Sequence, residues 1–228
     1  MRGVTEIEYL GHSAFVIRNS GKEVLIDPFL TDNPKAPPSA SLVRPDLILV
    51  THAHHDHLGD ALELSKRFSC PVLSVSEIND HLEEKGARVL QGNLGGEIEL
   101  PFCRVKLFPA FHSSSFEDGR YGGAACSFLV RMGDRTIFHA GDTALFNDMS
   151  LIADEADISV ALLPVGGTYT MGVKDAVKAM RLLRARIMVP MHYDTWPSIA
   201  VDRSELVSAA PDHAFSVKVL APGERLVL

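Results

Sequence analysis

The sequence lacks any apolar run long enough to cross a bilayer, and it has little cysteine. No window approaches the roughly 20 apolar residues of a spanning helix, and residues 1–8 lack the apolar core of a signal peptide. We therefore expect a cytoplasmic protein with no membrane partner. Cys70, Cys103 and Cys126 are odd in number and include no CxxC pair, which predicts buried, reduced thiols rather than disulfides.

An excess of positive charge is also absent. The 22 Lys and Arg residues are outnumbered by 29 Asp and Glu, and the net charge of −7 disfavours extended nucleic acid as a partner. Hydrophobic residues at 46% and charged residues at 22% exclude disorder and a coiled coil. A length of 228 residues with no repeat or linker predicts one domain over residues 1–228.

The pattern of apolar residues begins with strands and then alternates helix and strand. We expect helices at 60–68, 76–85, 144–153 and 174–184, with Ser76 as an N-cap and Gly86 as a stop. This mixture predicts a layered α/β domain. The expected strands are 7–10, 14–18, 23–26, 47–50, 71–75, 97–109, 125–131, 136–138, 158–163, 187–189, 215–220 and 225–228, with a loop at 31–45.

Four potential metal ligands lie within six residues. His52, His54, Asp56 and His57 directly follow the buried run Leu47-Ile48-Leu49-Val50. Ligands just past the carboxyl end of a strand lie in the crevice where open α/β sheets bind their ligands. Alternate residues of extended backbone point to a common side, whereas His57 must face another direction. This geometry suits two metals better than one.

Three further groups repeat this placement. His112 follows an apolar strand, Asp142 follows Thr136-Ile137-Phe138, and His192 follows Ile187-Met188-Val189. Core packing does not readily explain four strand ends that each deliver His or Asp to one rim.

These residues resemble the metallo-β-lactamase superfamily, in which a histidine-rich motif is followed by a lone His, a Gly-Asp-Thr and a late His. Within it, the chain is similar to the UPF0173 group of metal-dependent hydrolases, itself similar to the ascorbate-6-phosphate lactonases. The resemblance covers nearly the whole chain and implies a four-layer αββα sandwich with the metals at one edge. The matching motifs are Gly11-His12-Ser13, Leu25-Ile26-Asp27-Pro28, His112-Ser113-Ser114, His139-Ala140-Gly141-Asp142-Thr143 and Pro164-Val165-Gly166-Gly167.

The resemblance implies a ligand set for two divalent ions. His52, His54 and His112 are assigned to the first metal; Asp56, His57 and His192 are assigned to the second, and Asp142 bridges them. Imidazoles with two carboxylates suit Zn²⁺, while Mn²⁺, Fe²⁺ and Ni²⁺ stay open. A structural zinc is the alternative, but such sites close with four protein ligands, often Cys, and no cysteine lies near the motif.

The expected mechanism follows from charge. Two metal ions that share a water lower its pKa from 15.7 toward about 7, which yields a bridging hydroxide at neutral pH. Asp142 and Asp56 are the expected catalytic carboxylates. We expect hydrolysis of a small ester, lactone or phosphodiester.

Three polar residues are expected to support the ligands. In the resembling family, Asp27 orients ligand histidines, although an Asp before Pro is also a turn former. His12 is expected near the site, and His139 is either a supporting residue or a core histidine. His55, His81 and His213 are interpreted as residues outside the site.

Substrate contacts are expected from loops that follow the ligand strands. Ser113 belongs to a polar loop after His112, Gly167 and Thr168 offer backbone donors, and Tyr193 follows His192. Trp196 is either a wall of the site or a core residue.

Two other functions remain open. A nuclease or phosphodiesterase of the same superfamily would use the same metals on nucleic acid, but usually needs an added domain to hold RNA. A non-catalytic metal-bound interaction module is the other. The expected partner is a small-molecule substrate, and the resemblance leaves a homo-oligomer open.

Overall fold

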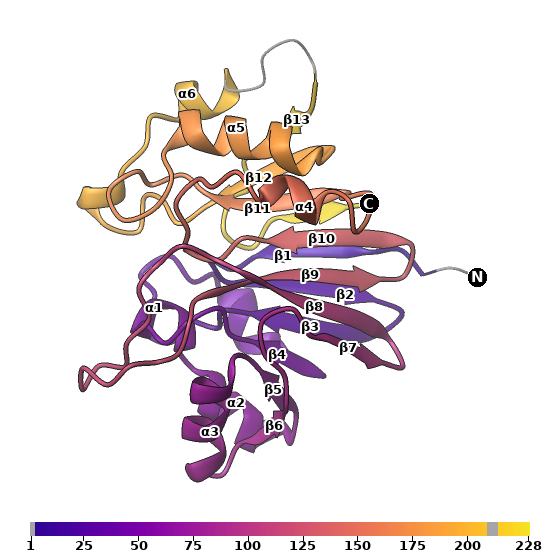
Figure 1. Ribbon diagram of the computed structural model, residues 1–228, viewed down its shortest axis with the longest axis vertical. Coiled ribbons are helices and arrows are strands. Elements are labelled where there is room, and N and C mark those ends of the chain that lie inside the picture. The colour runs from indigo at the N-terminus through magenta and orange to yellow at the C-terminus, as the bar shows by residue number, and fades with distance from the viewer. Residues whose placement is uncertain (1–2, 209–213) are drawn as a thin grey trace.

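The computed structural model describes residues 3–208 and 214–228. Two seven-stranded sheets face each other, and helices cover their outer surfaces (Figure 1). The arrangement is the four-layer αββα sandwich of the metallo-β-lactamase fold, as the sequence predicts.

The first sheet has the order β14-β1-β2-β3-β4-β5-β6. Its strands are antiparallel from β14 to β3 and parallel from β3 to β6. The parallel part places the carboxyl ends of β3 and β4 side by side. The strands are β1 (Glu6–Tyr9), β2 (Phe15–Asn19), β3 (Lys22–Ile26), β4 (Leu47–Leu49), β5 (Pro71–Leu73), β6 (Arg88–Leu90) and β14 (Arg225–Val227).

The second sheet has the order β13-β12-β11-β10-β9-β8-β7. It is parallel from β13 to β10 and antiparallel from β10 to β7. Strands β8, β10 and β12 therefore run in one direction and end at the same edge. The strands are β7 (Glu97–Leu100), β8 (Cys103–Pro109), β9 (Cys126–Met132), β10 (Arg135–His139), β11 (Val160–Pro164), β12 (Ile187–Met191) and β13 (Ser216–Val217).

The helices form the two outer layers. Helices α2 and α3 contact β5 and β6 of the first sheet, and α5 contacts β11 of the second. Helix α5 buries Ala176, Met180 and Leu183 on one face, the spacing expected of an amphipathic helix. The helices are α1 (His55–Leu58), α2 (Ala61–Phe68), α3 (Ser76–Glu84), α4 (Met149–Ile152), α5 (Val173–Leu183) and α6 (Arg203–Val207), with the 3₁₀ turns η1 (Pro38–Leu42) and η2 (Pro197–Ile199).

The main core is the space between the sheets. Phe15 of the first sheet and Phe128 and Phe138 of the second are fully buried there. Strand β4 is buried on both faces, which is why it reads as a continuous apolar run. A smaller core lies outside the first sheet, around Leu25 and Val43.

Several expected elements were wrong in detail. The single strand expected at 97–109 is a hairpin, β7 and β8, because residues 101–102 turn. The helix expected at 144–153 is only α4, and β6 and α6 were not predicted because they are short. Ser76 is the first residue of α3 rather than its N-cap; Val75 precedes it without a side-chain cap.

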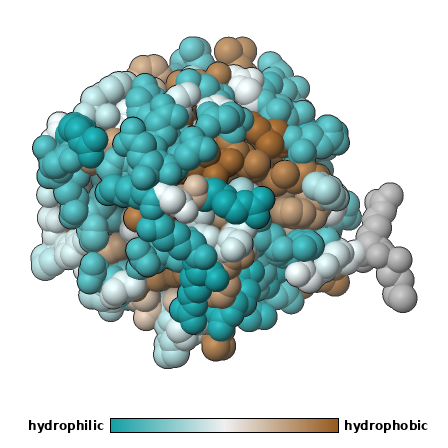
Figure 2. Space-filling view, turned by 90° about the horizontal axis from the view of Figure 1, so that it is seen from below, coloured by the Kyte–Doolittle hydropathy of each residue, from teal (hydrophilic) through white to brown (hydrophobic). Residues whose placement is uncertain are grey.

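The surface at the end of the molecule that carries α3 and β6 is largely hydrophilic, with one hydrophobic area (Figure 2). All three cysteines are buried and free, as predicted. Among the residues described, no helix is both long and apolar enough to cross a membrane.

Candidate metal centre

Four strand ends bring the sequence-predicted ligands together at one edge of the sandwich. The turn that contains His52 and His54 follows β4 of the first sheet. His112, Asp142 and His192 follow β8, β10 and β12 of the second. The site therefore lies between the sheets, on the side where α1 is drawn (Figure 1).

The backbone explains why neighbouring residues of the histidine motif face different ways. His54 is extended (φ −62°, ψ 145°), and α1 begins at the next residue. The change from extended to helical backbone points Asp56 away from His54, whereas the ring of His57 stays 4.1 Å from that of His52. One short segment thus serves two groups of side chains.

The first group has three imidazoles. His52 Nε2 lies 3.0 Å from His54 Nδ1, and the ring of His112 lies 5.1 Å from that of His52 and 5.2 Å from that of His54. One nitrogen from each ring falls within 4.8 Å of the other two. Three convergent nitrogens can hold one metal ion.

The second group combines a carboxylate with imidazoles. Asp56 Oδ2 lies 3.9 Å from both His57 Nε2 and His192 Nε2. It also lies 3.0 Å from His12 Nε2. One ligand atom from each of these four residues lies within 4.8 Å of the other three.

Asp142 lies between the two groups. Its Oδ2 is 3.5 Å from His112 Nε2 of the first group and 3.0 Å from His192 Nε2 of the second. Its Oδ1 is 3.3 Å from His57 Nε2. One carboxylate therefore contacts both groups, as a bridging ligand must.

Asp27 and Thr51 fix the orientation of two histidines from behind. The Nδ1–H of His57 donates to Asp27 Oδ2 over 2.7 Å, which leaves Nε2 facing the cluster. Thr51 donates its hydroxyl to the same oxygen and lies 3.0 Å from His52 Nδ1. Carboxylates that hold ligand imidazoles in this way set their tautomer.

His12 supports Asp56 from the other side. Burial lowers the pKa of His12 to about 4, so the ring is neutral. Its Nδ1 lies 2.8 Å from Thr195 Oγ1, and its Nε2 faces Asp56. A hydroxyl that donates to Nδ1 leaves the proton on Nε2, where it is donated to Asp56.

Sequence reasoning did not identify Thr51 or Thr195 as functional. Thr51 could have been found from its position, because it is a hydroxyl residue placed directly between the buried strand and the first histidine of the motif. Nothing in the sequence points to Thr195, because its partner His12 lies 183 positions away.

Backbone strain is concentrated at this site. His12, Asp27 and His192 adopt left-handed conformations with φ of 57°, 47° and 55°. The amide of His192 donates to the carbonyl of His12 over 2.8 Å. Non-glycine residues in this region cost free energy and occur where the surrounding structure imposes them.

The electrostatics fit a bound cation. Burial lowers the pKa of His57, but the charges of Asp142, Asp27 and Asp56 outweigh burial and raise it well above the ordinary value. Burial lowers the pKa of His52 well below the ordinary value, so this ring is neutral, as a ligand must be. The three carboxylates thus favour a cation at this position, and the neutral ring of His52 offers a lone pair.

Buried side-chain atoms that lack a hydrogen-bond partner also indicate a cation site. His57 Nε2, Asp142 Oδ1 and His192 Nδ1 are buried and make no hydrogen bond. Buried polar atoms without partners are costly. Two of the three point into the cluster, toward each other, where a metal ion would satisfy both.

The remaining histidines lie outside the cluster. His139 contacts Ser13 O and the amide of Gly141, so it holds the loop before Asp142 rather than a ligand side chain. His55 is half exposed beside Asp32 and Glu117. His213 lies outside the described residues.

The surroundings of His81 differ from the sequence prediction. His81 was interpreted as part of a solvent-exposed helix face, but its ring stacks on Phe116 with centroids 4.1 Å apart. It thereby joins α3 to the loop after His112.

The expected substrate contacts divide into exposed and buried groups. Ser113 and Thr168 are exposed. The amide of Gly167 donates to Met171 O and that of Thr168 to Gly166 O, and a contact of either residue with substrate stays a prediction. Tyr193 is buried and lines a small cavity with Tyr9.

Comparison with known proteins places this fold and site in the β-lactamase superfamily. A model of the β-lactamase superfamily domain matches residues 6–192, which include every residue of the two ligand groups. A metallo hydrolase from Ignicoccus hospitalis has the same fold, with a TM-score of 0.90 and 36% identity over 99% of this chain and 98% of its own. An isothiocyanate hydrolase from Delia radicum gut bacteria shares the fold at 19% identity and a TM-score of 0.78, over 97% of this chain and 98% of its own.

Curated relatives narrow the class to a family. Metal-dependent hydrolases of the UPF0173 family from Thermus thermophilus and Pyrococcus abyssi are each 46% identical to the chain. Both alignments span 99% of this chain and 100% of the relative. The chain belongs to the UPF0173 family of metal-dependent hydrolases.

Proposed function

We propose that the enzyme binds two divalent cations and hydrolyses a small ester, lactone or phosphodiester. The position of Asp142, within 3.5 Å of a histidine from each group, is the observation that carries this proposal. The first ion would be held by His52, His54 and His112 and the second by Asp56, His57 and His192. Asp142, which contacts His112, His57 and His192, would bind both. The donor set of nitrogens and carboxylate oxygens suits Zn²⁺.

Divalent ions bound at these groups would lower the pKa of a shared water and so supply hydroxide at neutral pH. Asp142 and Asp56 are the carboxylates that face this position, and their oxygens would accept hydrogen bonds that orient the attacking water. Asp56 is the more open of the two, with 25% of its side chain exposed against 3% for Asp142. Substrate would therefore approach from the Asp56 side.

Aromatic side chains near the ligand groups favour a substrate with an apolar part. Phe111 directly precedes His112 and is 60% exposed. Trp196 is 37% exposed, and its ring lies 4.9 Å from that of His12. Tyr169 is exposed on the loop that Met171 ties to Thr143. Exposed rings around a polar centre are typical of small-molecule sites.

The test combines metal analysis with turnover. Protein purified without chelator should contain close to two metal ions per chain, and a chromogenic ester, lactone or phosphodiester should be cleaved in a chelator-sensitive reaction. His57→Ala and Asp142→Ala should each lower the metal content to one ion or none and reduce turnover at least about a hundredfold. His55→Ala is the matched control, because this neighbour of His57 faces Asp32 and Glu117.

Two results would contradict the proposal. One is a parent protein that contains a single metal ion per chain and an Asp142→Ala variant with the same metal content. The other is turnover that persists when the protein has been stripped of metal.

A further inference from the structure

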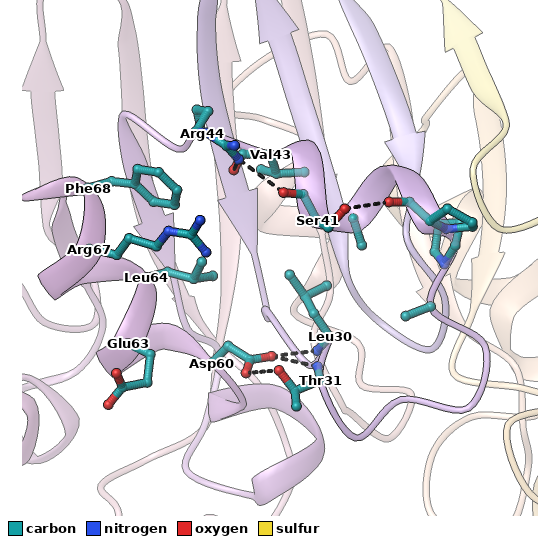
Figure 3. Close-up of a pocket in the computed structure, with 14 residues that line it drawn as sticks. Leu30, Thr31, Ser41, Val43, Arg44, Asp60, Glu63, Leu64, Arg67 and Phe68 are labelled. Atoms are coloured by element: carbon teal, nitrogen blue, oxygen red, sulfur yellow. Dashed lines mark hydrogen bonds between the residues drawn. The ribbon is translucent and has the colours of Figure 1, made fainter.

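A cavity of about 620 Å³ lies on the outer side of the first sheet, between η1 and α2 (Figure 3). Its apolar lining includes Leu30, Ala40, Val43 and Leu64, and all four belong to or pack against the smaller core. The volume falls within the range of about 300–1,000 Å³ of small-molecule sites. The cavity shares no residue with the two ligand groups.

Two guanidinium groups share one aromatic ring at the edge of this cavity. Arg44 and Arg67 lie 5.0 and 5.1 Å from the centre of the Phe68 ring, one above and one below it in the view of Figure 3. Arg44 uses Nη1 to donate to the carbonyls of Ser41 and Val43. Two cations held at one ring repel each other, and an anion bound beside them offsets that repulsion.

No carboxylate of the lining balances these charges. The oxygens of Asp60 accept from the amides of Leu30 and Thr31 and from the Thr31 hydroxyl. The carboxylate of Glu63 points away from the Arg67 guanidinium (Figure 3). Across residues 3–208 and 214–228, the guanidinium of Arg67 makes no hydrogen bond and no ion pair.

Helix stability explains only part of this arrangement. Arg67 lies in the last turn of α2, where a cation interacts favourably with the helix dipole. That interaction does not require Arg44, nor does it require an apolar cavity beside the two cations. An anion with an apolar body satisfies both features at once.

We propose that this cavity binds an amphipathic organic anion, with a phosphate or carboxylate head on Arg44 and Arg67 and a hydrocarbon part against Leu30, Val43 and Leu64. Guanidinium groups bind both kinds of head through paired hydrogen bonds. The net charge of −7 makes this patch a local exception on an acidic protein. The inference stands independently of the metal centre.

Methyl NMR of the metal-loaded protein tests this inference at the site itself. Octyl phosphate and octanoate are the probes, and the methyl groups of Leu30, Val43 and Leu64 are the reporters. These signals should shift in a saturable manner with either anion. The double variant Arg44→Gln/Arg67→Gln should weaken the fitted affinity about tenfold or more. Lys66→Gln is the matched control, since it removes one charge from the same helix outside the cavity lining.

The probes also separate the two parts of the ligand. Inorganic phosphate should bind more weakly than octyl phosphate, and 1-octanol more weakly than either anion. The inference is overturned if the reporter methyl groups do not shift, if the double variant binds as tightly as the parent, or if 1-octanol binds as tightly as the anions. A preference between the two anions identifies the head group.

Discussion

At the scale of single residues, the position of one proton on each histidine ring decides whether that ring offers a lone pair to a metal. Asp27 accepts three hydrogen bonds, from Thr51 N, from Thr51 Oγ1 and from His57 Nδ1. It is fully buried, and so is His57. A carboxylate in this position keeps the proton on Nδ1 and the lone pair of Nε2 directed at the cluster.

Asp27→Asn is expected to weaken metal binding about 10–100-fold. The amide accepts more weakly and can present its NH₂ group to Nδ1, which favours the wrong tautomer of His57. The measurement is the metal affinity obtained by competition with a chromogenic chelator. Asp32→Asn is the control, because among the described residues the ion-pair partner of this exposed carboxylate is His55, outside the ligand groups. Equal metal affinities in the two variants would mean that Asp27 does not orient a metal ligand.

At the scale of elements, the segment that precedes α2 must pass close to the loop after β3. Gly59 has φ 39° and ψ −126°, and a Cβ there would lie 2.4 Å from Pro28 O and 2.7 Å from Phe29 Cα. Asp60 donates its amide to Pro28 O at the same place. This close approach joins the backbone after His57 to the loop after Asp27.

Gly59→Ala is expected to lower the free energy of unfolding by about 2–4 kcal/mol, because backbone strain adds to a clash with backbone atoms. Gly95→Ala is the control for strain alone, since Gly95 also has a positive φ of 81° but nothing lies near its Cβ. It should cost about 1–2 kcal/mol. Denaturant unfolding of both variants measures the difference, and equal costs would mean that Pro28 moves aside.

A buried carboxylate of the first sheet, Glu8, joins four elements. Glu8 of β1 accepts hydrogen bonds from Arg18 of β2, Ser39 of η1 and Arg225 of β14. Burial alone raises the pKa of Glu8, but these hydrogen bonds and the charges of both arginines outweigh it and lower the pKa below 4.5. The fold therefore favours the ionised form.

Glu8→Gln is expected to lower the free energy of unfolding by roughly 1–3 kcal/mol at pH 7. The folded pKa is depressed, so the contribution of Glu8 is complete above its ordinary pKa and is lost as the pH falls through the folded value. The gap between parent and variant should thus narrow below about pH 4.5. Glu99→Gln, at an exposed ion pair with Arg104, should change stability by less than about 0.5 kcal/mol at any pH.

At the scale of the whole molecule, the candidate metal centre connects the two sheets. His52, His54, Asp56 and His57 follow a strand of the first sheet, and the other three ligands follow strands of the second. Ions bound there would cross-link the two halves of the sandwich. Binding to the folded chain alone raises its stability by mass action.

Metal removal is therefore expected to lower the melting temperature by about 5–10 °C, the shift for an ion present at about 100 times its Kd in a chain of this size. Differential scanning calorimetry with and without chelator measures this shift. Asp142→Ala should respond to chelator much less than the parent, since it already lacks the bridging group. An identical shift in both proteins would place the stabilising metal elsewhere.

The sequence was sufficient for the fold class, the family and the seven ligand-competent residues. A buried parallel strand such as β4 reads as an apolar run. The ligands that follow β8, β10 and β12 share one edge because these three strands run in the same direction. Short elements such as β6 and α6 were not predictable, because a few residues carry too little periodicity to identify them.

Tertiary structure alone decided which atoms meet. The contacts of Thr195 with His12, of Asp142 with both histidine groups, and of Arg44 with Phe68 join segments that are far apart in the chain. Local sequence sets backbone periodicity and strand ends. The direction and partner of each side chain depend on how distant segments pack, and that packing exists only in the folded molecule.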